Sequence, residues 1–179
     1  LLKLIFVNSG SNTNHWVMKV DKVIRGIRNM IASNNYIIKS KKNVAHHYDL
    51  SDKLYDLFLD KDRQYSCAYF NSPNDTLEQA QQNKLELIAK KLLLEKDQNV
   101  LDIGSGWGGM AAYLSKRSNV NVKGVTLSEE QITYSQQRKI DESLDQVQYE
   151  LQDYRKVREK YDRIVSVGMF EHVGTAHYQ

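Results

Sequence analysis

The sequence has one cysteine, one proline and no long apolar run. A single cysteine cannot form an internal disulfide, so a disulfide-stapled secreted scaffold is excluded and a reducing cytoplasm is favoured. The longest apolar run near the N-terminus, LLKLIFV, is far too short to span a bilayer. With 41% apolar and 26% charged residues, the 179-residue chain is predicted to be soluble or membrane-peripheral, with one globular core.

Positive charge is concentrated near the N-terminus, although the formal net charge is only +3. Seven basic residues but a single acid lie between Lys19 and Lys42, and apolar residues recur there at helical spacing. Such a basic amphipathic helix can lie on an anionic membrane, or it can pack on a neighbouring domain with a solvated outer face. No basic stripe interleaved with aromatics follows it, so no nucleic-acid partner is expected.

Strand and helix patterns alternate through the rest of the chain. The only proline, Pro73, lies in a turn, and a capping box of Thr76 and Gln79 then opens a helix whose apolar positions run to Leu92. Further on, the pattern predicts strands at 99–103, 120–127, 147–152 and 161–170, with helices at 110–117 and 129–143. This alternation predicts an α/β fold with a doubly wound, mostly parallel sheet.

The first turn of that pattern, LDIGSGWGG, indicates a ligand site. Gly104, Gly106 and Gly109 match the dinucleotide pattern G-x-G-x-x-G, which allows a tight turn and close approach of a ligand to the backbone. The glycines alone do not separate a dinucleotide from S-adenosylmethionine (SAM). A dinucleotide site needs an acid at the end of the second strand, where this sequence has Thr126. Asp102, two residues before the first glycine, is more typical of SAM sites.

Five segments together resemble one family. HHYDLSDKLYDLFLDKDRQYSCAYF, VLDIGSGWGG, GVTLSEEQ, LQDYRKV and YDRIVSVGMFEHVG occur in order from His46 onwards. They resemble the cyclopropane-fatty-acyl-phospholipid synthases and the related mycolic acid cyclopropane synthases. The resemblance implies a class I SAM-dependent methyltransferase fold of the Rossmann-like type. The family's catalytic half continues beyond FEHVG, so we expect a fragment that stops after the fourth strand and is inactive on its own.

The resemblance assigns cofactor-binding roles to nine residues and implies no metal. The methionyl part of SAM is expected at Tyr65 and Ser66. The main cradle of SAM is expected at Asp102, Gly104 and Gly106. The ribose is expected at Thr126 and Gln131, and the adenine end at Asp153 and Tyr154.

The resemblance also implies a role for the lone cysteine. Cys67 of YSC and Glu171 of FEH match family residues that hold a bicarbonate ion. In the implied reaction, an acyl-chain double bond attacks the SAM methyl group, and a bound base removes a proton as the cyclopropane ring closes. A carboxylate would repel bicarbonate, so one of the two is expected to carry a proton. Tyr48 is expected to line the pocket, or to be a core residue.

Several expectations concern the protein as a whole. Residues 1–42 are expected to be the end of a preceding domain and a linker helix, and residues 43–179 the N-terminal part of the catalytic domain. The substrate is expected to be an unsaturated phospholipid acyl chain, reached by a cytoplasmic protein at the inner face of the membrane. A homo-oligomer is possible. The alternatives are a related methyltransferase with a mycolate or amine acceptor, and a non-catalytic SAM-binding module.

Overall fold

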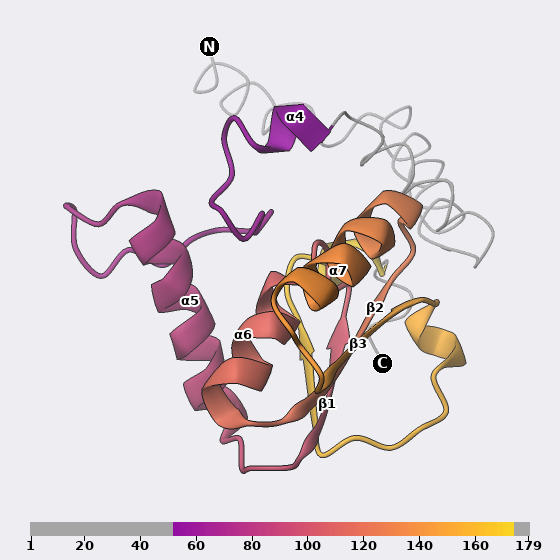
Figure 1. Cartoon of the computed structure of the whole chain (residues 1–179). Coiled ribbons are helices and arrows are strands. Elements are labelled where there is room, and N and C mark those ends of the chain that lie inside the picture. The colour runs from indigo at the N-terminus through magenta and orange to yellow at the C-terminus, as the bar shows by residue number, and fades with distance from the viewer. Residues whose placement is uncertain (1–51, 174–179) are drawn as a thin grey trace, which may run out of the picture. The chain divides into compact units, whose positions relative to one another are not determined.

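The computed structural model describes residues 52–173 (Figure 1). The predictions for residues 1–42 and for Tyr48 lie outside this range. Up to Glu171 the described residues belong to one compact unit. Its elements are, in order, α4 (Asp52–Tyr55), α5 (Leu77–Leu92), β1 (Asn99–Ile103), α6 (Gly109–Ser118), β2 (Asn121–Thr126), α7 (Glu129–Asp141), β3 (Val147–Leu151), η1 (Tyr154–Lys156), β4 (Arg163–Ser166) and η2 (Phe170–His172).

The four strands form one parallel sheet in the order β3-β2-β1-β4. In the register, Asp102 of β1 lies between Gly124 of β2 and Val165 of β4. Because the carboxyl ends of parallel strands meet at one edge of the sheet, the loops that follow β1, β2 and β4 come together there. The prediction of a parallel α/β sheet is confirmed, and within the described residues β4 is an edge strand, as expected.

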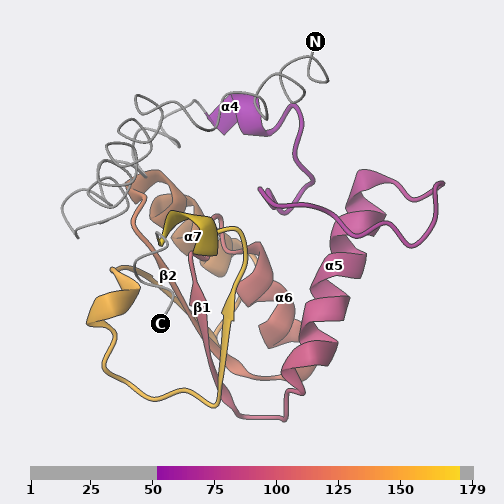
Figure 2. The same ribbon diagram turned by 180° about the vertical axis from the view of Figure 1, so that it is seen from behind.

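Helices α6 and α7 cover one face of this sheet. Helix α6 contacts β2 and β3, α7 contacts β3, and α5 packs against α6. Seen from behind, the strands lie in front of α6 and α7 (Figure 2). The apolar side chains between the helices and the sheet form the core, which includes Leu85, Val100, Ala111, Leu114, Val122, Val147, Tyr149 and Val165.

The fourth strand is shorter than the sequence predicts. The apolar run at 161–170 suggested one long strand, but β4 ends at Ser166. Gly168 has φ +71°, which turns the chain away from the sheet, and Phe170 begins the short helix η2. Within β4 only Val165 is buried, whereas Ile164 is 58% exposed. The strand is therefore covered on one face only within the described part of the chain.

Helix α5 begins as its capping box predicts. The Thr76 hydroxyl accepts from the Gln79 backbone N–H at 3.2 Å, and the Gln79 side chain accepts from the Thr76 N–H at 2.8 Å. The buried face of α5 carries apolar residues, but it also carries Gln81 and Lys84. Buried polar side chains need hydrogen-bond partners, so the partners of these two residues are expected in the segment that packs on α5.

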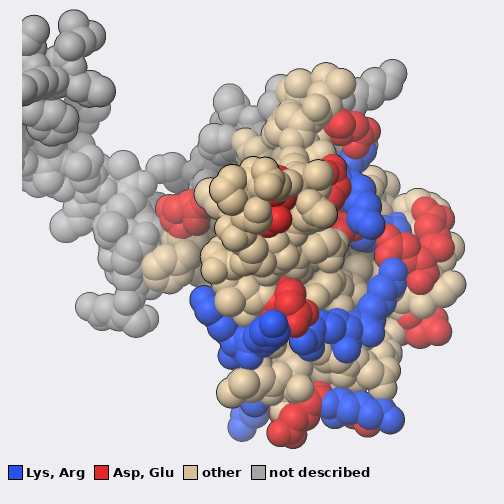
Figure 3. Space-filling view, turned by 90° about the vertical axis from the view of Figure 1, so that its left-hand side faces the viewer, with Lys and Arg blue, Asp and Glu red and all other residues tan. Residues whose placement is uncertain are grey.

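A band of Lys and Arg side chains crosses the side of the molecule on which α5 lies (Figure 3). The last turns of α5 and α6 are basic, which is favourable next to the partial negative charge of a helix C-terminus. Glu86 pairs with both Lys90 and Arg117 at the surface. Helix ends and ion pairs thus account for the basic residues in the last turns of α5 and α6.

Candidate cofactor-binding site

The glycine turn leaves β1 at the sheet edge where the loops meet. Gly104 has φ +74° and Gly106 has φ +56°, a conformation that favours glycine. The backbone N–H groups of Gly104 and Ser105 donate to the Val125 carbonyl of β2, at 2.9 and 3.1 Å. A Cβ atom on Gly106 would meet no atom within 4 Å. The turn is therefore fixed to the sheet and borders open space at Gly106.

Asp102 is the most unusual charged residue of this region. Its side chain lies in the central strand and is 2% exposed, and its Oδ2 atom has no hydrogen-bond partner among the described residues. Burial raises the pKa of the Asp102 carboxyl to about 7. A buried carboxylate oxygen without a donor, close to an open glycine turn, fits a ligand that brings a positively charged donor, such as the ammonium group of SAM.

The end of β2 brings two predicted residues together. The Thr126 hydroxyl donates to Oε1 of Gln131 at 2.7 Å, and both side chains are buried. The Ser128 hydroxyl caps α7 by accepting from the Gln131 backbone N–H at 3.2 Å. Because Oε1 accepts from Thr126, the Gln131 side chain presents its amide nitrogen to further acceptors. This arrangement suits hydroxyl oxygens such as those of a ribose.

The carboxylate predicted at the adenine end is held by a neighbour. Asp153 caps η1 and accepts from the Arg155 backbone N–H at 3.0 Å and from its guanidinium at 2.9 and 2.6 Å. Burial acts to raise the pKa of Asp153, but the hydrogen bonds from Arg155 outweigh burial and lower it. Tyr154 is half-buried beside the same arginine. Sequence reasoning missed Arg155, and the adenine contacts of Asp153 and Tyr154 stay predictions.

The loop that carries Tyr65, Ser66 and Cys67 is held by hydrogen bonds. The buried Asp60 carboxylate accepts from the Gln64 backbone N–H at 2.8 Å and from the Gln64 side-chain amide at 3.0 Å. From α5, the Gln81 amide donates to the Ser66 carbonyl at 3.0 Å. The Lys84 ammonium donates to the Ser66 hydroxyl at 2.7 Å. Sequence reasoning missed Gln81 and Lys84; their signal is that both interrupt the apolar face of α5.

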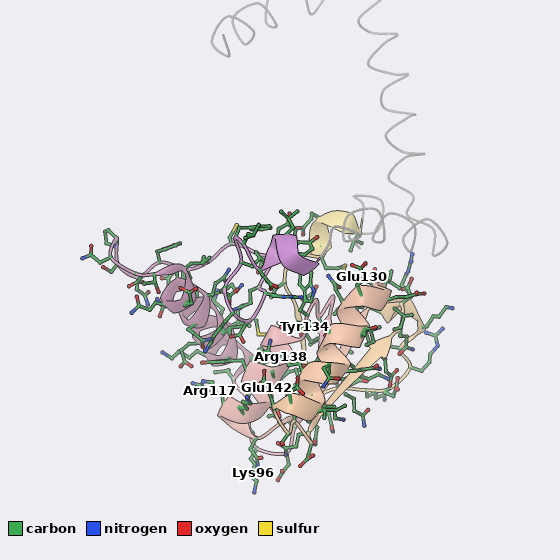
Figure 4. All side chains as sticks on the ribbon, turned by 45° about the horizontal axis from the view of Figure 1, so that its top comes forward. Lys96, Arg117, Glu130, Tyr134, Arg138 and Glu142 are labelled. Carbon is green, nitrogen blue, oxygen red and sulfur yellow. The ribbon has the colours of Figure 1, made fainter. Side chains whose placement is uncertain are left out.

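The same loop is tied to α7. Tyr134 and Arg138 of α7 and Glu142, the residue directly after the helix, follow one another on the side that faces α6 (Figure 4). The Arg138 guanidinium donates to the Asp62 carboxylate. The Arg63 guanidinium lies 4.2 Å from the centre of the Tyr134 ring. A cavity of about 400 Å³ is lined by Arg138, Glu142 and their neighbours. These contacts tie the loop to α7 as well as to α5.

The loop and the end of β4 lie next to the glycine turn. A Cβ atom on Gly168 would lie 3.7 Å from the Ser66 Cβ, and one on Gly104 would lie 3.0 Å from the Met169 Cβ. Cys67 on the loop is exposed, and so is Glu171 in η2. The structure therefore gathers the predicted methionyl residues and the glycine turn around one region, whereas the bicarbonate roles of Cys67 and Glu171 stay predictions. Among residues 52–173, no three His, Cys, Asp or Glu residues are grouped as a metal site.

Together, the parallel sheet, the glycine turn after its central β1 and the buried acid two residues before that turn define the class I SAM-dependent methyltransferase fold. Comparison with known proteins narrows the class. The sequence model of the family described as "Mycolic acid cyclopropane synthetase" matches residues 36–179. The chain belongs to this family, which confirms the resemblance recognised from its motifs.

Individual relatives agree with the family. The chain is 50% identical over 145 residues to the cyclopropane-fatty-acyl-phospholipid synthase of Escherichia coli K12, covering 79% of this chain and 37% of that protein. It is 45% identical over 137 residues to a probable fatty acid methyltransferase of Pseudomonas putida, covering 75% of this chain and 35% of that protein. A solved mycolic acid cyclopropane synthase, CmaA1 with bound SAH and CTAB, superposes with a TM-score of 0.74 at 40% identity, covering 77% of this chain and 49% of that one. The chain thus spans about a third of these curated relatives.

Proposed function

We propose that this protein is an enzyme that transfers a methylene group from SAM to the double bond of an unsaturated acyl chain in a membrane phospholipid, forming a cyclopropane ring. The observation that carries the proposal is the buried Asp102 carboxylate, whose Oδ2 atom has no partner, near a glycine turn that borders open space. The high identity to a phospholipid-modifying relative supports the choice of acceptor.

The described residues suggest how SAM would be held. Asp102 would accept from the ammonium group, and the backbone at Gly104 and Gly106 would lie along the methionyl part. Tyr65 and Ser66 would contact the same part from the opposite loop. Thr126 and Gln131 suit the ribose, with Asp153 and Tyr154 towards the adenine. When bound, SAM supplies a methyl group with an electrophilic carbon.

Cys67 and Glu171 are proposed to hold a bicarbonate ion. Bound there, the ion would supply a base for the proton that is lost as the ring closes. The support is the position of the Cys67 loop, which borders the end of β4, just before Glu171. Because the Glu171 carboxylate and bicarbonate are both acidic groups, the site works only if one of them keeps a proton and donates it in a hydrogen bond.

The membrane relation of the protein is part of the proposal. No helix among the described residues has the length and hydropathy of a membrane span. We propose a cytoplasmic enzyme that contacts the inner face of the membrane through the basic residues between Lys19 and Lys42. Charge-reversal of these residues should reduce the share of the protein that sediments with anionic vesicles at low salt.

The decisive test is mass spectrometry of membrane fatty acids from cells that express the full-length protein. A gain of one methylene per unsaturated chain is expected, and a Gly106→Val variant should show none. A methyl-branched product without a ring would instead favour a fatty acid methyltransferase. Unchanged lipids in cells that contain the folded, SAM-binding protein would refute a lipid acceptor and favour an amine acceptor or a non-catalytic SAM-binding module.

A further inference from the structure

Lys84 is a buried cation at the edge of the cofactor site. Lys84 is 7% exposed, and its ammonium group donates to the Ser66 hydroxyl at 2.7 Å. Within residues 52–173 it forms no ion pair with a carboxylate. Burial lowers the pKa of Lys84 to about 8, and the nearby Asp60 and Cys67 offset this only in part.

The direction of this hydrogen bond determines what Ser66 can do. An ammonium group donates and cannot accept, so the Ser66 oxygen must be the acceptor. The Ser66 hydroxyl proton is then free to point to another acceptor. Gln81, one turn earlier on α5, holds the Ser66 carbonyl at 3.0 Å. Helix α5 thus fixes both oxygen atoms of Ser66 and orients it as a donor.

Lys84 is a buried cation and Asp102 is a buried anion. Each is buried, and neither forms an ion pair with a described residue of opposite charge. A ligand with one ammonium and one carboxylate group would neutralise both charges. The amino-acid part of SAM carries these two groups. Ser66 lies beside the end of β4, and the glycine turn after Asp102 touches the same segment at Met169. The two charges therefore border one region from different elements.

We propose that Lys84 is a positioning residue of the cofactor site, which orients the Ser66 hydroxyl as a donor to the carboxylate of the bound amino-acid part. This inference rests on the proposed function for the identity of the ligand. Lys84 acts through Ser66 and need not touch the cofactor. A hydrogen bond to a charged group is stronger than one between neutral groups, so the loss should be readily measurable.

The test uses two ligands that differ in the amino-acid part. S-adenosylhomocysteine carries the carboxylate and the ammonium, whereas 5′-methylthioadenosine carries neither. Calorimetry of Lys84→Met is expected to show affinity for S-adenosylhomocysteine reduced about tenfold or more, with affinity for methylthioadenosine changed by less than about twofold. Lys91→Met, an exposed lysine on the same helix, is the matched control and should leave both affinities unchanged.

The outcomes separate the two proposals. If Lys84→Met weakens both ligands equally, the lysine has only a structural role and the inference is wrong; unchanged affinity for both ligands would also overturn it. If the unmodified protein binds neither ligand, the proposed function fails and the inference with it. Ser66→Ala provides a second route should Lys84→Met not fold. It should reproduce the selective loss by itself. Where Lys84→Met does fold, adding it to Ser66→Ala should lower the affinity for S-adenosylhomocysteine by less than about twofold.

Discussion

Replacing Asp102 by asparagine is expected to stabilise the protein while weakening SAM binding. The carboxylate is buried in the central strand, and burial raises its pKa from 3.8 to about 7. Ionised Asp102 therefore opposes folding. The sign follows from proton linkage: between the two pKa values the folded state binds more protons, so the stability of the protein falls as the pH rises. This cost is absent below about pH 4 and complete above about pH 7.

The magnitude follows from the shift. About three pK units at 1.36 kcal/mol each give an upper estimate of about 4 kcal/mol at pH 8, and about 2 kcal/mol at pH 5. The amide of asparagine is neutral, but a buried amide without hydrogen-bond partners reduces the stabilisation by about 1–3 kcal/mol. That second contribution does not depend on pH. The stabilisation by Asp102→Asn at pH 8 should therefore exceed that at pH 5 by about 2–3 kcal/mol.

Urea denaturation at the two pH values, followed by circular dichroism, measures this difference. Asp145→Asn, the same substitution at an exposed position, is a suitable control. An equal effect of Asp102→Asn at pH 5 and pH 8 would refute the buried, uncompensated charge. Calorimetry of the same variant should show weakened SAM binding, and unchanged affinity would refute the contact with the ammonium group.

Four further outcomes are expected. Gly106→Val should abolish SAM binding, because its side chain fills the open space at the turn; calorimetry with a thermal unfolding control checks this. In the full-length enzyme, Cys67→Ser should retain partial cyclopropane formation, since a hydroxyl still donates a hydrogen bond, and complete loss in a folded variant would indicate an essential thiol. Ile164→Lys should reduce any self-association through the exposed edge strand, as measured by sedimentation. At pH 6, SAM binding should release protons if Asp102 ionises in the complex, because burial raises the pKa of this carboxyl to about 7; calorimetry in buffers of different ionisation enthalpy measures the release.

The fold was largely readable from the sequence because its signals are local. The capping box placed the start of α5, and short apolar runs between turn residues placed β1, β2 and β3 to within about a residue. The end of β4 was missed for a physical reason. Its apolar residues continue past Ser166, but the chain turns at Gly168, and an apolar residue next to a glycine carries no sign of where the strand ends.

The site was readable only in part. Asp102, the glycine turn and the pair of Thr126 and Gln131 were predicted, because they lie in or directly after strands whose ends must meet. Lys84 and Arg155 were not, because a polar residue on a helix or after a strand is by default a solvated one. Their importance comes from a loop 18 residues away in the sequence for Lys84, and from a short-range ion pair for Arg155. No periodicity encodes either contact.

The two buried charges, Asp102 in β1 and Lys84 in α5, raise the question why a stable fold would keep unfavourable residues beside the proposed cofactor site. Burial disfavours the charged forms of Asp102 and Lys84, so each lowers the stability of the protein when no ligand is bound, although Asp60 offsets part of this cost for Lys84. The cost is recovered when a ligand supplies the opposite charges, and an adenosine ligand without the amino-acid part cannot supply them. The two buried charges therefore make the site selective for SAM over adenosine ligands that lack the amino-acid part. The affinity lost on neutralising either residue should consequently appear with S-adenosylhomocysteine and be absent with methylthioadenosine.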